Sequence, residues 1–273
     1  MSGYDLAHAY ETVNIHRREG AAKIELNRPE TLNAWNRQFS YDLLAAVRAV
    51  AADQTVRAVM VTGAGRGFSS GADLREIGGH EDRTPEGEPD LHTTLTERYH
   101  PIMTGIRRMP KPVLAAVNGP AVGIGCALAL CCDLIVAAES AYFSLAFVNI
   151  GLVPDGGSSL FVPARAGIAR AFEMAMLGDR VPAVQAEAWG LANRVHPDAS
   201  FAAEADELLG RLAAGPTRAY AGAKRELNHR IYAGMDEQLE LEADIQQEMG
   251  TSKDFAEGVN AFAEKRPAEF SGA

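Results

Sequence analysis

Three short apolar runs, spaced along the middle of the chain, constrain the fold more than any other feature. They occupy residues 58–62 (AVMVT), 113–117 (VLAAV) and 134–138 (LIVAA). Runs of this length and composition are typical of buried strands. The small, apolar residues 123–132 between the second and third runs fit a buried helix. Strand and helix therefore alternate, which predicts an α/β fold with helices packed on a sheet.

The segments before these runs carry their own periodicity. Residues 13–16 and 22–26 alternate apolar and polar side chains around Gly20, which predicts a hairpin. Apolar residues spaced by three and four predict an amphipathic helix over residues 33–53. Residues 78–95 are polar, rich in proline and glycine, and aperiodic, so we expect a mobile surface loop there.

The character of the sequence changes near residue 200. From there on only helical segments are expected, over residues 199–214, 216–232, 235–249 and 253–265, the last behind a Thr251-Ser252 cap. We therefore divide the chain into a core, residues 1–198, and an α-helical region, residues 199–273. The second has few large apolar residues, so it is expected to pack on the core or on another subunit.

Composition excludes several classes of partner. The 36 acidic and 26 basic residues give a net charge of −10, so nucleic acid is not an expected partner. The longest small and apolar run has twelve residues, 121–132, and is too short to span a membrane. No secretion signal opens the chain, and the three cysteines suggest neither disulfides nor a metal site, so a cytoplasmic location is expected. The scattered histidines suggest no metal either.

Three motifs carry candidate chemistry, each with a structural alternative. Residues 67–71 match the G-x-S-x-G pattern of serine hydrolases, but five residues separate the strand from Phe68, so Ser69 fits a tight loop better. Gly123-Ile124-Gly125 at a helix start suits an oxyanion or phosphate cradle, or close packing of helix on sheet. Asp155 lies in apolar surroundings that would raise its pKa and suit proton transfer, or it caps a helix.

Taken together and in order, the motifs resemble the enoyl-CoA hydratase/isomerase (crotonase) superfamily. The resemblance covers nearly the whole chain. The segments that carry it are LNRP with LNA (26–34), GFSSGADL (67–74), KPVLAAVNGPAVGIG (111–125), GLVPDGG (151–157) and FAEGV with AFAEKR (255–266). It implies a spiral of ββα units followed by helices that build a homotrimer, often doubled to a hexamer. It also implies acyl-CoA thioester substrates, with CoA as part of the substrate and no separate cofactor.

The resemblance also assigns roles to residues. It implies that the backbone N–H groups of Ala72 and Ile124 form an oxyanion hole for the thioester oxygen, and that Asp155 is the acid/base. The remaining substrate contacts that it implies are Ala34, Asp73 and Leu74 for the adenine and pantetheine parts, and Phe262 and Lys265 for the nucleotide end of CoA. Phe147, with Phe143 and Phe161, could line an apolar acyl pocket or simply belong to the core.

One departure from the hydratase pattern decides the expected activity. True hydratases of this family flank the acyl double bond with two glutamates, and those positions align with Ala127 and Phe147 here. Adding water needs groups that activate it and deliver a proton, so hydration is disfavoured. One aspartate suffices to move a proton between two carbons. The sequence therefore favours an isomerase over a hydratase, another enolate-forming enzyme or an inactive scaffold. Within the family, residues 144–147, 151–157 and 177–178 and the tail most resemble the 1,2-epoxyphenylacetyl-CoA isomerase branch.

Overall fold

In the computed structural model, which describes residues 3–75 and 83–273, the chain builds a seven-stranded sheet in the order β1-β2-β3-β4-β5-β7-β10. β1 to β3 are antiparallel neighbours, and from β3 onward the strands pair in parallel. A smaller sheet has the order β6-β8-β9. The strands are β1 Asp5–Ala9, β2 Val13–Arg18, β3 Ala21–Leu26, β4 Ala58–Gly63, β5 Val113–Val117, β6 Ala121–Val122, β7 Leu134–Ala138, β8 Tyr142–Ser144, β9 Val181–Pro182 and β10 Arg194–His196.

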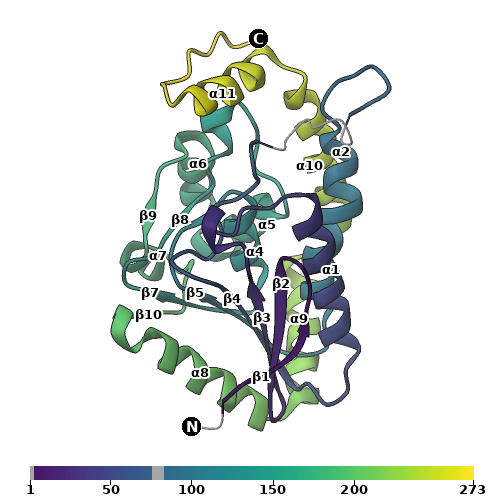
Figure 1. Ribbon diagram of the computed structural model, residues 1–273, viewed down its shortest axis with the longest axis vertical. Helices are drawn as coiled ribbons and strands as arrows, with labels where there is room; N and C mark the ends of the chain where they lie inside the picture. Colours follow the sequence, from purple (N-terminus) through teal and green to yellow (C-terminus); the bar gives the residue numbers. More distant parts are fainter. Residues whose placement is uncertain (1–2, 76–82) are drawn as a thin grey trace.

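Helices cover the sheet and extend beyond one end of it (Figure 1). The α-helices are α1 Arg37–Ala52, α2 Leu91–Thr94, α3 His100–Arg108, α4 Ile124–Cys131, α5 Ser158–Ala166, α6 Ile168–Leu177, α7 Ala183–Trp189, α8 Asp198–Ala214, α9 Thr217–Ile231, α10 Met235–Gly250 and α11 Lys253–Glu264. The expected α/β class is confirmed, and the predicted hairpin and three buried strands lie where the sequence placed them.

The helix expected over residues 33–53 begins later, at Arg37. Leu32 and Asn33 have positive φ values of 55° and 57°, so they cannot continue a helix. The buried Asn33 amide instead donates to the carbonyl oxygens of Ala64, Gly67 and Phe68. This asparagine ties the loop after β3 to the loop after β4, and that positions one side of the site described below.

The segment expected to be a loop over residues 78–95 is only partly one. Residues 78–82 lie outside the described residues. Helix α2 starts at Leu91, with Asp90 accepting from the N–H of Thr93 at 2.9 Å, and it continues through a π-helical turn, Leu95–Tyr99, into α3. The expectation was wrong from Leu91 onward because Leu91 and Leu95 are buried core residues.

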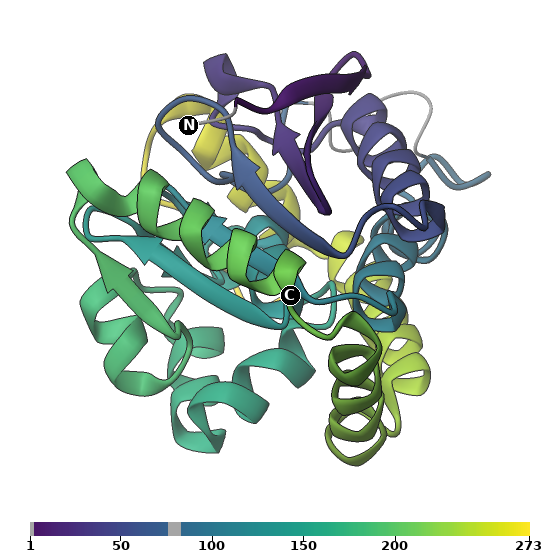
Figure 2. The ribbon, with the colours of Figure 1, turned by 90° about the horizontal axis from the view of Figure 1, so that it is seen from below.

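The four C-terminal helices are confirmed as α8 to α11, including the Ser252 cap, which accepts from the N–H of Phe255 at 3.0 Å. Helix α8 lies across one face of the main sheet, where it contacts β3, β4, β5, β7 and β10 (Figure 2). Helix α9 is tied to the core by Lys224, whose buried ammonium pairs with Asp133 at 2.8 Å. Among the described residues, no helix is both long and apolar enough to cross a membrane.

Candidate active site

A cavity of about 640 Å³ opens among loops that follow the parallel strands. Loops at the carboxyl ends of parallel strands are the usual place for a ligand site in an α/β sheet. Here the loops after β3 and β4 form one wall, and the segment from β6 into α4 forms the next. Helix α2 with the turn after it, the 3-10 helix Phe147–Ile150 and helix α10 complete the lining.

Two glycines lie where two of these loops meet, one because of close approach and both because of a positive φ. Gly71 has a φ of +93°, and a Cβ there would lie 2.9 Å from the carbonyl oxygen of Val122. Gly123 has a φ of +54°, and its Cβ would lie 3.8 Å from the Cα of Gly71. Any other residue at Gly71 would push the loops apart. The loops are also bridged through Ser69, whose carbonyl oxygen accepts from the N–H of Val122 at 2.9 Å.

The residues that follow these glycines are Ala72 and Ile124, and both line the cavity. Ala72 forms a parallel bridge with Trp35, whose bonds go to Gly71 and Asp73, so the N–H of Ala72 points away from that partner. Ile124 is the first residue of α4, where an N–H has no acceptor within its own helix. Within the described ranges, neither N–H donates to another protein group. Two residues with unused backbone donors thus line one cavity, and their role as an oxyanion hole stays a prediction.

Asp155 lines the same cavity and is 5% exposed. Its Oδ2 accepts from Gln246 Nε2 at 2.8 Å, while Oδ1 has no partner among the residues described. Burial raises the pKa of Asp155 well above its ordinary value, the nearby Glu242 charge adds to this, and the Gln246 bond opposes it. The helix-cap alternative is wrong, because Gly157 is the N-cap of α5 and no side chain of α5's own N-terminus caps it.

Helix α10 contributes two buried side chains that the sequence analysis missed. Glu242 and Gln246 are 3% and 1% exposed, and both contact the turn that carries Asp155. Their sequence signal is weak: two polar residues, four apart, share a helix face with the buried Leu239 and Ala243. Such residues are read as solvated unless the opposing surface is known.

Ser69 does not have the surroundings of a nucleophile. It is fully buried, its hydroxyl donates to the carbonyl oxygen of Asn33 at 2.9 Å, and it accepts from Trp35 Nε1 at 3.1 Å. A Cβ at Gly125 would lie 2.5 Å from Ser69 Oγ, so helix α4 covers the hydroxyl. The serine hydrolase alternative is therefore wrong, and Ser69 is a structural bridge between two loops.

The candidate substrate-binding residues separate into three groups. Ala34, Leu74, Phe147 and Phe262 line the cavity, and Phe262 is 59% exposed. Asp73 lines it too, but ion pairs with Arg75 at 2.9 Å and Arg28 at 3.3 Å lower its pKa, chiefly through the Arg75 hydrogen bond. Lys265 is exposed at the C-terminus of α11 and does not line the cavity.

The other two aromatic candidates for the acyl pocket do not line the cavity. Phe143 and Phe161 are fully buried in the hydrophobic core. Phe143 lies on β8, and Phe161 packs edge-on against Tyr232 at a centroid distance of 5.4 Å. The simpler reading as core residues holds for both, and Phe147 alone of the three reaches the cavity.

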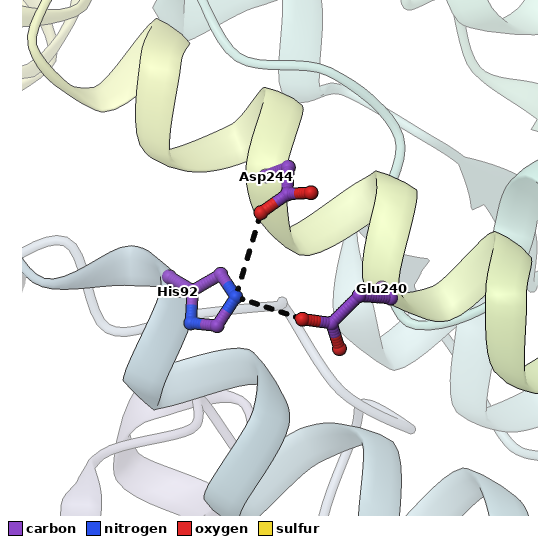
Figure 3. Close-up of side chains that lie close together, drawn as sticks. All are labelled: His92, Glu240 and Asp244. Atoms are coloured by element: carbon purple, nitrogen blue, oxygen red, sulfur yellow. Dashed lines mark hydrogen bonds and ion pairs between the residues drawn. The ribbon is translucent and has the colours of Figure 1, made fainter.

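Histidine does meet carboxylates at one place on the surface. His92 Nε2 lies 3.2 Å from Glu240 Oε1 and 3.6 Å from Asp244 Oδ1, with the histidine on α2 and the acids one turn apart on α10 (Figure 3). Within residues 3–75 and 83–273, this is the one group of three side chains with metal-ligating atoms so close. All three side chains are at least one-third exposed, and they join α2 to α10 directly by ion pairs.

Comparison with known proteins gives a consistent result. The enoyl-CoA hydratase/isomerase family model matches residues 16–273. The chain is 41% identical to a probable enoyl-CoA hydratase of Rhodobacter capsulatus, over 97% of this chain and 99% of that protein. It is 40% identical to the 1,2-epoxyphenylacetyl-CoA isomerase of Escherichia coli, over 96% and 99%.

A solved structure agrees with these sequence matches. The crystal structure of an enoyl-CoA hydratase from Mycobacterium avium subspecies paratuberculosis is 37% identical, with a TM-score of 0.87. The match covers 96% of this chain and all of that one. The crotonase fold expected from the sequence is therefore confirmed.

The burial of Asp155 predicts a pH-dependent effect on stability. The pKa of Asp155 in the folded protein is raised above its unfolded value of about 4. The protonated carboxyl therefore makes its full contribution to the free energy of unfolding below pH 4, and this contribution is lost as the pH rises through the folded pKa. Asp155→Asn escapes this loss. In urea unfolding between pH 4 and 8, the free energy of unfolding of Asp155→Asn should rise relative to that of the native protein by up to about 1.4 kcal/mol per pH unit.

A matched control has the opposite sign. The pKa of Asp254 is lowered, first by the N–H of Ser271, so its carboxylate stabilises the fold above the unfolded pKa and loses that effect as the pH falls. With the titration extended below pH 4, the free energy of unfolding of Asp254→Asn should fall relative to that of the native protein as the pH rises to about 4, and the difference should stay constant above it. A constant difference between Asp155→Asn and the native protein across pH 4 to 8 would contradict the burial account.

Proposed function

Because the chain belongs to the enoyl-CoA hydratase/isomerase family, we propose that it is an acyl-CoA isomerase that shifts a double bond, or rearranges an epoxide, through a thioester enolate. The observation that carries the proposal is the state of the cavity's carboxyl groups. Among the described lining residues these are Glu30, Asp73 and Asp155. Glu30 is exposed and Asp73 is ion paired, so Asp155 is the one buried and unpaired acid.

The oxyanion hole supplies the first part of the mechanism. Removing a proton beside the thioester carbonyl leaves an enolate with negative charge on oxygen. In the proposal the N–H groups of Ala72 and Ile124 donate to that oxygen, and the N-terminus of α4 adds a favourable dipole. Since Gly71 and Gly123 fix both loops, these donors need no rearrangement as the charge develops.

Asp155 supplies the second part. Its ionised carboxylate takes a proton from C2 of a 3-enoyl thioester, and the electron pair of that bond moves into the enolate. The enolate then takes the same proton back at C4, so the double bond ends between C2 and C3 and the carboxylate is regenerated. A raised pKa suits this exchange, because a weaker acid is a better base toward carbon. No net oxidation occurs and no separate cofactor is needed.

Water addition is the competing reaction, since one relative in the comparison is named a hydratase. It needs a second group to handle the water, and the two positions implied for that role are apolar. Ala127 is fully buried and does not line the cavity, while Phe147 lines it with a ring. Incubating a 3-enoyl-CoA and a 2-enoyl-CoA separately in deuterated water, with product analysis, tests the choice: an isomerase interconverts them and exchanges deuterium, whereas a hydratase accumulates the 3-hydroxyacyl-CoA.

The CoA part of the substrate is proposed to leave the cavity past Ala34, Leu74 and Phe262. The cavity lining also includes Arg37, Arg66 and Arg75. These arginines would place positive charge near the phosphates of CoA, although the whole chain is acidic. Asp73 holds two arginine side chains in place by ion pairs, one with Arg28 and one with Arg75. Lys265 stands outside the cavity and is proposed to meet the nucleotide end of CoA.

We also propose a homotrimeric assembly, which the C-terminal helices and α6 would support. Helix α6 carries an exposed apolar face: Ile168, Phe172, Met176 and Leu177 are 55–66% exposed. Leu227 and Ile231 on α9 and Leu241 on α10 are also exposed. Contiguous exposed apolar side chains of this size are characteristic of an interface between subunits.

Replacing the acid/base tests the proton-transfer step. Asp155→Asn keeps the shape and removes the proton carrier, so kcat for 3-enoyl-CoA isomerisation should fall about 10²- to 10⁴-fold while CoA-ester affinity changes little. Asp236→Asn on the exposed face of α10 is the control. Full turnover by Asp155→Asn would assign the proton transfer to another group.

A proline substitution tests the oxyanion hole. Proline is tolerated at the first position of a helix, so Ile124→Pro removes the N–H without breaking α4, and it also shortens a buried side chain. Its kcat/KM should fall about 10²- to 10³-fold, whereas Ile124→Val, which keeps the donor, should be close to native. Similar rates for the two variants would exclude this N–H as a donor.

A charge on α6 tests the assembly. Sedimentation should give three times 29.2 kDa for the native protein, or six times where two trimers pair, and Phe172→Glu should shift it toward monomer because a buried charge would face the partner. Glu173→Gln, on the polar side of the same helix, should sediment as the native protein does. A native protein that sediments as a compact monomer would refute the proposal.

A further inference from the structure

The turn that carries Asp155 is held by two side chains from one face of α10. Glu242 and Gln246 are four residues apart, so they lie one above the other on the helix. Both are almost fully buried, at 3% and 1% exposed. Buried polar side chains are costly unless each atom is bonded, and here the bonds all go to residues 153–159.

Glu242 replaces a missing helix cap. Its carboxylate accepts from the N–H of Gly157 at 2.7 Å and of Ser159 at 3.1 Å, and also from the Ser159 hydroxyl. These are among the first N–H groups of α5, whose own N-cap is a glycine without a side chain. A negative group at a helix N-terminus is favourable. Burial raises the pKa of Glu242 to about 7, while these hydrogen bonds oppose that rise. The ionised carboxylate on α10, fully present above that pH, therefore fixes the turn just after Asp155.

Gln246 fixes the residues just before and at Asp155. Its Oε1 accepts from the N–H of Val153 at 3.0 Å, and its Nε2 donates to Asp155 Oδ2 at 2.8 Å. The backbone N–H can only donate, so the atom facing Val153 must be the amide oxygen. The amide nitrogen must then face Asp155, and its donated bond favours the ionised carboxylate.

We propose that Gln246 is the positioning residue of Asp155: its amide occupies Oδ2 and leaves Oδ1 to meet the substrate, while Glu242 holds the turn that carries them. Oδ1 is itself buried, belongs to a residue that lines the cavity, and has no partner among the described residues. The inference rests on the proposed function insofar as Asp155 is the proton carrier there. The inference assigns to helix α10, which is distant in the sequence, the role of positioning the Asp155 carboxylate.

The two side chains act on the Asp155 proton in opposite directions. The Gln246 bond lowers the pKa of Asp155, whereas the Glu242 charge raises it, in addition to the effect of burial. The other elements packed on the turn present apolar groups: a Cβ at Gly156 would meet Ile124 and Ala127 of α4 and Met103 of α3. Among the described residues, Glu242 is thus the one charged group shown to act on this carboxyl.

Opposite effects give a test that a merely structural role would fail. Gln246→Met keeps the length of the side chain and removes both hydrogen bonds, so the pKa of Asp155 should rise. Glu242→Gln keeps the size and removes the charge, so the pKa should fall. Each shift should be on the order of one pH unit. Glu248→Gln is the control, because Glu248 is exposed on the same helix and none of the bonds to residues 153–159 comes from it.

The direct readout is the titration of the Asp155 carboxyl by ¹³C NMR of aspartate-labelled protein, assigned by its absence in Asp155→Asn. In the pH profile of kcat/KM, the apparent pKa of the acid limb should shift in the same direction, to higher pH for Gln246→Met and to lower pH for Glu242→Gln. Gln246→Met should also lower kcat more than it changes KM. If Gln246→Met does not fold, Gln246→Asn removes the same bonds, since its amide is one methylene shorter.

The outcomes separate this inference from the proposed function. Shifts of opposite sign support it, whatever reaction the enzyme catalyses. Shifts of the same sign, or none, overturn it even if Asp155→Asn is inactive. Opposite shifts together with full turnover by Asp155→Asn would instead refute the proposed role of Asp155 and leave the positioning intact.

Discussion

The contact between α10 and the two walls of the cavity is the interaction on which the site depends. One face of α10 holds the Asp155 turn through Glu242 and Gln246. Neighbouring positions hold α2: Gln247 accepts from the N–H groups of Leu91 and His92 at 2.8 and 3.1 Å, and His92 pairs with Glu240. The Asp155 turn and helix α2 are thus both held in place by α10.

Backbone approach fixes the other half of the site. Gly71 brings two loops closer than a side chain would allow, Gly123 supplies a positive φ of 54°, and Asn33 and Ser69 bond the loops behind them. The cavity therefore receives backbone donors from one side and a buried carboxyl from the other. Such a carboxyl costs stability when it ionises, a cost accepted where the raised pKa is useful for chemistry.

The sequence predicted the parts of this arrangement that local patterns determine. Strands buried on both faces read as continuous apolar runs, and the glycines and the aspartate stand in motifs whose order resembles the family. Helix α2 was missed because residues 78–95 are polar and broken by proline up to Asp90, and only contact with Gly250 and the core shows why Leu91 is buried. Glu242 and Gln246 were missed because a polar pair on a helix looks solvated until the turn it faces, 83 or more residues earlier, is known.

The most direct test of the account is the transfer of a label from C2 to C4 in a single turnover. With a 3-enoyl-CoA deuterated at C2, a buried aspartate that carries the proton between the two carbons should deliver part of the label to C4 of the product. The same experiment with Asp155→Asn should show no transfer. Equal transfer by the native protein and by Asp155→Asn would contradict the account.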